Sequence, residues 1–102
     1  MAETKRPLDE RKISVVDELL KEGCPGDQVM NDYDFSRSAQ FYRVGPPGAV
    51  RHRVFVSKEF FDDHATDEIQ GLLRGWRLLE HIKQAGAKTV IVTNGGITTV
   101  GT

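Results

Sequence analysis

The feature that most constrains the fold is a strand-to-helix transition at Ser57, which coincides with a reversal of charge. Between Phe35 and Lys58 the chain has five basic residues and no acidic one, and between Glu59 and Glu68 it has five acidic residues and no basic one. Before Ser57 apolar and polar residues alternate, as in a half-buried strand, and a serine followed by an acid-rich stretch is typical of a helix start. The pattern predicts a domain that combines sheet and helix.

Residues 39–56 predict a β-hairpin. Two runs rich in aromatic and β-branched residues flank a turn with two prolines and two glycines, and the three segments are Ala39–Val44, Gly45–Gly48 and Ala49–Val56. Pairing Val44 with Ala49 places Phe41 on the core face together with the alternating valines. The opposite face is then aromatic and basic, with Tyr42, Arg51, Arg53 and Phe55.

Helical spacing of apolar residues predicts two helical regions. In residues 9–23, Asp9 can cap a helix whose core face is formed by Ile13, Val16, Leu19 and Leu20. Residues 57–86 predict a short helix that Ser57 caps, and then a long helix capped by Thr66 and stopped at Gly86. The core stripe of the long helix is Ile69, Leu72, Leu73, Trp76 and Leu79. Its remaining arc is also apolar, so we expect a second contact besides the sheet.

The other segments complete a single domain over residues 1–102. We expect residues 1–8 to be frayed and residues 24–38 to form a loop. Residues 88–100 predict a closing strand, after which Asn94-Gly95 favours a type I′ turn. The last residues either pair back, with Val92 opposite Ile97, or form a frayed tail. The expected fold is α+β: an antiparallel sheet of three or four strands packed against one long helix, with an extra N-terminal helix.

Composition narrows the class of protein. A chain of 102 residues with 38% hydrophobic residues is typical of one globular domain. No apolar run approaches the ~20 residues that cross a bilayer, and a single cysteine, Cys24, cannot form an internal disulfide. We therefore expect a cytoplasmic protein without a membrane span. A net charge of -1 argues against a dedicated nucleic-acid binder, although charge segregated along the chain can still form a basic face.

The sequence contains no constellation typical of catalysis or metal binding. It has no H-x-x-x-H or C-x-x-C spacing, and the acidic group Glu59, Asp62 and Asp63 supplies too few carboxylates on one helical face for a cation cage. We expect no catalytic residue, no cofactor and no metal, and hence a protein that is not an enzyme.

Two hypotheses for function remain. The first is a non-enzymatic protein-interaction module that binds a protein partner or itself, as a homodimer, through the apolar arc of the long helix at Gly71, Gly75, Leu78 and Ile82. The second is a nucleic-acid-associated protein that uses a basic hairpin face with Arg43, Arg51, Arg53 and Tyr42. A simpler explanation of these arginines is that they pair with the acidic segment after Ser57.

The segment VFVSKEFFDDH, residues 54–64, also resembles a strand–Ser–basic–Glu–x–apolar–x–Asp–His pattern in a family of small bacterial proteins of unknown function. In that family a β-hairpin is likewise followed by helices and a closing strand. The resemblance covers residues 35–93. It implies a bacterial or phage origin and a compact α+β fold, and it brings no activity and no site residues.

Overall fold

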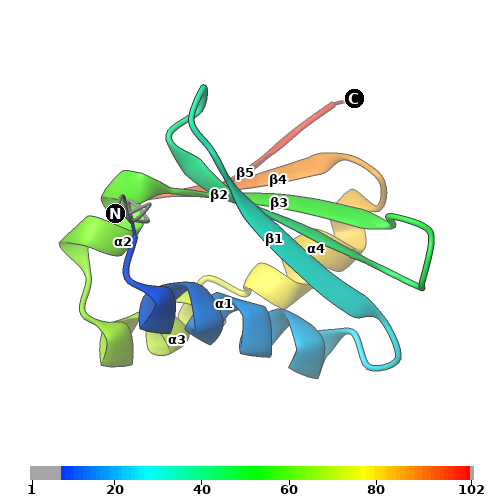
Figure 1. Ribbon diagram of the computed structural model, residues 1–102, viewed down its shortest axis with the longest axis horizontal. Helices are drawn as coiled ribbons and strands as arrows, with labels where there is room; N and C mark the ends of the chain where they lie inside the picture. The colour runs from blue at the N-terminus through cyan, green and yellow to red at the C-terminus, as the bar shows by residue number, and fades with distance from the viewer. Residues whose placement is uncertain (1–7, 102) are drawn as a thin grey trace, which may run out of the picture.

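The computed structural model describes residues 8–101 as one five-stranded sheet with its helices packed on one face (Figure 1). The predicted fraying of residues 1–8 lies outside the described residues except at Leu8, which is buried. In chain order the elements are α1 (Glu10–Gly23), β1 (Gln28–Asp34), β2 (Ala39–Gly45), β3 (His52–Ser57), α2 (Lys58–Asp63), α3 (Thr66–Gly75), α4 (Leu78–Ala85), β4 (Thr89–Thr93) and β5 (Gly96–Val100).

The sheet is mixed, with strand order β1-β2-β3-β4-β5. Neighbouring strands are antiparallel except β3 and β4, which run parallel. Parallel neighbours require a crossover, and here the chain passes through α2, α3 and α4 before it returns as β4. The α+β prediction is confirmed, whereas the prediction of a purely antiparallel sheet of three or four strands is wrong.

Strand β1 occupies much of the segment that the sequence predicted to be a loop. Asn and Asp are depleted in strands, and β1 contains three of them, so strand propensity did not predict a strand here. Pairing with β2 forms the strand nevertheless, and Asp34 then closes the hairpin: its Oδ1 accepts hydrogen bonds from the backbone N–H groups of Ser36 and Arg37 at 3.0 and 3.2 Å.

The register between β2 and β3 differs from the predicted one. Val44 lies opposite His52 instead of Ala49, a shift of three residues, and the backbone N–H of Arg51 donates to the carbonyl of Val44 at 2.8 Å. Gly45 permits this longer loop, because a Cβ there would lie 2.5 Å from the carbonyl oxygen of Ala49. A shift by an odd number of residues exchanges the two faces of a strand. The predicted faces of β2 are therefore reversed.

The reversal places Tyr42 in the core. Its side chain is fully buried between the sheet and α1, and its hydroxyl donates a hydrogen bond of 2.8 Å to the carbonyl of Ile13. Burial, and to a smaller extent the charge of Asp17, raise the pKa of Tyr42 well above its ordinary value. The same face of the sheet is covered by the helices and carries buried side chains on three strands: Val44, Val54, Val56, Val90 and Val92.

The first two helices begin as the sequence predicted. The backbone N–H of Arg11 donates to Asp9 Oδ1 at 2.9 Å at the start of α1, and that of Phe60 donates to Ser57 Oγ at 3.1 Å at the start of α2. All four residues of the predicted core face of α1 are buried. The third begins slightly differently, because Thr66 is its first residue and Ala65 its cap.

The predicted long helix is two helices. Arg77 adopts a left-handed conformation, with φ 60°, between α3 and α4. For a residue with a side chain this conformation costs about 1–3 kcal/mol, which packing must offset. The break lets α3 pack against α1 while α4 packs under β3, β4 and β5. Within the predicted core stripe, Ile69 and Leu73 are buried and Leu72, Trp76 and Leu79 are partly buried.

The C-terminal residues form the hairpin that the sequence left open. Strand β5 pairs antiparallel with β4, and Val92 lies opposite Ile97 as predicted. The turn is not type I′, because neither Asn94 nor Gly95 has a positive φ; Gly96, with φ 122°, takes the unusual conformation instead. None of the helices described between residues 8 and 101 has the length and apolar character needed to cross a membrane.

We expect Tyr42→Phe to lower the free energy of unfolding by about 1 kcal/mol at neutral pH, because it removes a buried hydrogen bond. The raised pKa also predicts a pH effect. Above about pH 10 the phenol ionises in the unfolded chain while it stays protonated in the fold, so stability falls as pH rises, by up to about 1.4 kcal/mol per pH unit.

Urea unfolding between pH 8 and 11 measures this loss, which Tyr42→Phe should reduce. Tyr33→Phe is the matched control, since it keeps the phenol at position 42. An equal alkaline loss in wild-type and Tyr42→Phe proteins would contradict the assignment.

Candidate functional site on the open face of the sheet

The face of the sheet opposite the helices, here called the open face, is not covered by any helix in residues 8–101 (Figure 1). Strand register places an aromatic pair at its centre, because Phe41 lies directly opposite Phe55. The two rings stack with their centroids 4.4 Å apart and their planes 11° apart. Ile91 follows on β4, opposite Phe55, and Met30 and Val100 add exposed apolar side chains on the two edge strands. Phe41, Phe55 and Ile91 thus form an apolar row across the three central strands. Met30 and Val100 flank this row from the neighbouring register positions, opposite Arg43 and Thr89.

Two arginines lie against the aromatic pair. The guanidinium carbon of Arg37 is 4.7 Å from the centroid of Phe55, and that of Arg43 is 5.6 Å from the centroid of Phe41. Both distances are within the range of cation–π attraction. Each ring therefore contacts the other ring and an arginine, so a nucleobase that stacked on either ring would compete with contacts that the chain already makes.

The basic groups of this region have partners within the chain. Arg43 forms an ion pair with Asp32 at 3.0 Å, and Arg37 forms one with Asp34 at 3.6 Å. Arg53, which lies opposite Arg43, donates to the carbonyl of Ala87 at 3.3 Å. Such surface pairs contribute little to stability, but they neutralise the positive potential that a phosphate backbone would need.

These acidic partners lie on β1, and not in the segment Glu59–Glu68 that the sequence suggested. Arg51, in the loop before β3, follows the same rule, since it lies 3.7 Å from Asp27 just before β1. The arginines of this region are therefore neutralised by aspartates in and just before β1.

A hollow of ≈ 390 Å³ lies beside the aromatic pair. Phe55, Ile91 and Val100 give it an apolar lining, and Arg37 adds a charged side chain. Ser57, Thr89 and Thr93 add hydroxyl groups. Within residues 8–101 the lining has no acid, no histidine and no cysteine.

The residues of the predicted nucleic-acid face are separated by the structure. Arg43 and Arg53 share the open face, Arg51 lies in a loop, and Tyr42 is fully buried on the opposite side of β2. The assignment of Tyr42 to an exposed basic face is therefore corrected, and the cause is the shifted register.

The predicted protein interface on the helix is also divided. Leu78 and Ile82 are fully buried under the sheet, because the break at Arg77 turns them inward, whereas Gly71 and Gly75 are exposed on α3. Leu78 and Ile82, which suggested an uncovered arc, are thus covered within the chain. Only the two glycines stay at the surface, and they offer little apolar area.

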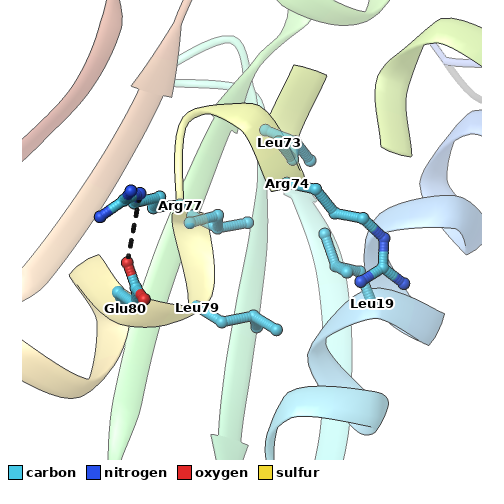
Figure 2. A pocket seen from close by; sticks show the side chains of 7 residues that line it. Leu19, Leu73, Arg74, Arg77, Leu79 and Glu80 are labelled. Carbon is cyan, nitrogen blue, oxygen red and sulfur yellow. Dashed lines mark ion pairs between the residues drawn. The ribbon is translucent and has the colours of Figure 1, made fainter. Parts of the chain in front are cut away.

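A smaller hollow of ≈ 190 Å³ lies where α1, α3 and α4 meet (Figure 2). Leucines line it, and its charged neighbours are already paired: Arg74 extends toward α1 and meets Glu22 at 2.7 Å, while Arg77 meets Glu80 at 3.7 Å. No charged group is left to bind a polar ligand here, so the open face is the stronger candidate.

The acidic segment after Ser57 has local structural roles. Asp62 accepts a hydrogen bond of 2.6 Å from Lys58, and this bond, together with the carboxylate charge, raises the pKa of Lys58. Asp63 accepts a hydrogen bond of 2.6 Å from Asn94 in the β4–β5 turn. Among residues 8–101 no three His, Cys, Asp or Glu side chains converge as metal ligands would.

Sequence reasoning missed Phe41 and Ile91 as residues of this surface. Phe41 was placed in the core by the wrong register. Arg37 was expected near the basic face, but the turn that holds it was not recognised as part of a hairpin. Ile91 reaches the same surface through the parallel pairing of β3 with β4, a contact between segments far apart in the chain.

No family model, no curated protein and no solved structure matches this chain. The resemblance of residues 54–64 to a bacterial family accordingly stays a prediction.

We expect Gly71→Ala to raise the free energy of unfolding by about 0.5–1 kcal/mol. Gly71 is inside α3, and a Cβ there would meet no atom within 4 Å, so alanine adds helix propensity without a clash. Gly45→Ala is the contrasting control and should destabilise the protein, because its Cβ would meet backbone atoms.

Urea unfolding at two protein concentrations measures both changes. A loss of stability in Gly71→Ala that grows with protein concentration would show that the α3 surface is a subunit interface after all.

Proposed function

We propose that this protein is a non-enzymatic interaction module that associates with a second copy of itself through the open face of its sheet. The observation that carries the proposal is the apolar row of Phe41, Phe55 and Ile91, flanked by the exposed side chains of Met30 and Val100, on a face with no helix over it in the described chain. Antiparallel sheet faces left in water are ordinarily polar. An aromatic and aliphatic row on such a face is typical of a surface that a partner covers.

The charges beside this row favour a second copy as the partner. Arg37, Arg43 and Arg53 share the surface with Asp32 and Asp34, so it presents both signs of charge. In an isologous dimer the same patch meets itself across a twofold axis. Arginines of one copy can then face aspartates of the other, and the aromatic rows meet at the centre. A uniformly negative partner would gain little from this surface, because Asp34 and Asp32 already neutralise Arg37 and Arg43.

We expect Ile91→Lys to weaken self-association, because a lysine at the β4 end of the apolar row would have to lose water on docking. Sedimentation equilibrium should show a rise of the dissociation constant by about tenfold or more, which corresponds to about 1.4 kcal/mol. The matched control is Gln70→Lys, which adds the same charge to an exposed position of α3. Equal association of the wild-type protein and both variants would contradict the proposal.

The alternative function is association with single-stranded nucleic acid. The observation that favours it is the meeting of two aromatic rings with arginines on the open face of the sheet, the combination that stacks bases and contacts phosphates in several RNA-binding folds, although Phe55 itself is only 7% exposed. The ion pairs of Arg37 and Arg43 weigh against it, since they reduce the positive charge on offer.

Fluorescence anisotropy with random single-stranded oligonucleotides across a salt series separates the two functions. We expect no binding that weakens steeply with salt, because few uncompensated cations are present to release counterions. Strong binding at low salt that Arg37→Gln reduces, and that Arg74→Gln on α3 leaves unchanged, would establish the alternative.

A further inference from the structure

Strand β5 forms one edge of the sheet, and its sequence has none of the features that protect such edges. Its five residues, Gly96–Val100, contain no charge and no proline, and the chain carries no charged residue from Thr89 to its last residue. Natural sheets usually blunt an edge with lysine, proline, a bulge or a covering segment. The other edge, β1, is protected in this way by Asp32 and Asp34.

An edge strand leaves every second residue with its backbone N–H and C=O directed away from the sheet. The residues of β5 after Gly96 all have side chains that favour a strand: Ile97, Thr98, Thr99 and Val100. The side chain of Val100 is also 43% exposed. An uncharged edge of this composition is a template on which another strand can pair.

We propose that β5 pairs antiparallel with β5 of a second copy of this chain, about a twofold axis at Thr98. This interface is separate from the open face, so the inference goes beyond the self-association proposed above. A copy of the chain is the favoured occupant, because an uncharged strand meets its own sequence without any like-charge contact, whereas Asp32 and Asp34 make the β1 edge a poorer template for a second strand.

The register follows from the length of β5 and from the alternation of its side chains. Full overlap of the five residues places Thr98 opposite Thr98, Ile97 opposite Thr99 and Gly96 opposite Val100. The exposed valine then packs against a glycine and the central threonines meet, which is a favourable cross-strand pair. A register shifted by one residue would turn the helices of the second copy to the other side of the sheet.

This pairing has a consequence for the hollow beside the aromatic pair. Val100 and Gly101 line that hollow at its β5 side, so the twofold axis places the hollows of two copies next to each other on one continuous sheet. The open faces of both copies then point the same way. Two isologous interfaces on one chain, the open face and the β5 edge, allow assemblies larger than a dimer.

Charge substitutions at Thr98 test the pairing. Thr98 is exposed and lies opposite Ile91 on the open face, so a single charge there leaves the fold of one chain intact. Thr98→Lys and Thr98→Glu should each weaken β5 pairing, since like charges would lie directly opposite each other. An equimolar mixture of the two variants should restore it, because the pair is then lysine with glutamate. Low ionic strength keeps the effect large.

Sedimentation equilibrium of three proteins separates the two interfaces. Thr98 shares the open face with Ile91, so its substitution reports on β5 pairing alone only where the open face is already disabled by Ile91→Lys. We expect the wild-type chain to form assemblies larger than a dimer, Ile91→Lys to form dimers, and the double variant with Ile91→Lys and Thr98→Glu to be a monomer. An Ile91→Lys protein that is already monomeric overturns the β5 pairing. An unchanged mass in Ile91→Lys overturns only the open-face proposal, and a monomeric wild-type chain overturns both.

Amide hydrogen exchange supplies a second readout that needs no variant. At low protein concentration the outward-facing amides of β5 should exchange rapidly, and at high concentration the pairing should protect them. Amides of β1, the opposite edge, are the internal control. Equal exchange of the β5 amides at both concentrations would overturn the inference, and failure of the Thr98→Lys and Thr98→Glu mixture to reassociate would overturn its register.

Discussion

The register between β2 and β3 governs both faces of this sheet. The hydrogen bond from the Arg51 amide to the Val44 carbonyl closes a long loop, and Gly45 gives that loop the room it needs. With this register Tyr42 points to α1 and Phe41 points to the open face. Because side chains alternate strictly along a strand, no intermediate arrangement exists. The core and the candidate site therefore depend on the same loop closure.

The open face derives its character from what surrounds the aromatic pair. The stacked rings make cation–π contacts with Arg37 and Arg43. The same two arginines form ion pairs with Asp34 and Asp32 of β1. The result is a surface that is apolar at the centre and balanced in charge at the rim. Such a surface suits a protein partner with matching charges of both signs, whereas phosphate binding would require an excess of one sign. This distinction is the reason for placing self-association ahead of nucleic-acid binding.

The break at Arg77 has a comparable effect on the helical side. A continuous helix from Thr66 to Ala85 would have left an apolar arc in need of a partner, which was the basis for the interface predicted there. The two shorter helices cover their own apolar residues, since α3 packs on α1 and α4 packs under the sheet. The surfaces proposed for self-association are therefore the open face and the β5 edge, and not the helices.

The amino-acid sequence by itself determined the elements with strong local signals. Asp9 and Ser57 mark two helix starts, and four aliphatic residues mark the buried face of α1. The last hairpin, with Val92 opposite Ile97, was one of two alternatives that the sequence left open. Only the tertiary structure decided whether β1 forms, how β4 pairs and where the helix breaks. Strand β1 has weak propensity and forms because β2 offers it partners. Phe41, Phe55 and Ile91 come together through β2–β3 and β3–β4 pairing, and pairing energies between distant segments leave no trace in local periodicity.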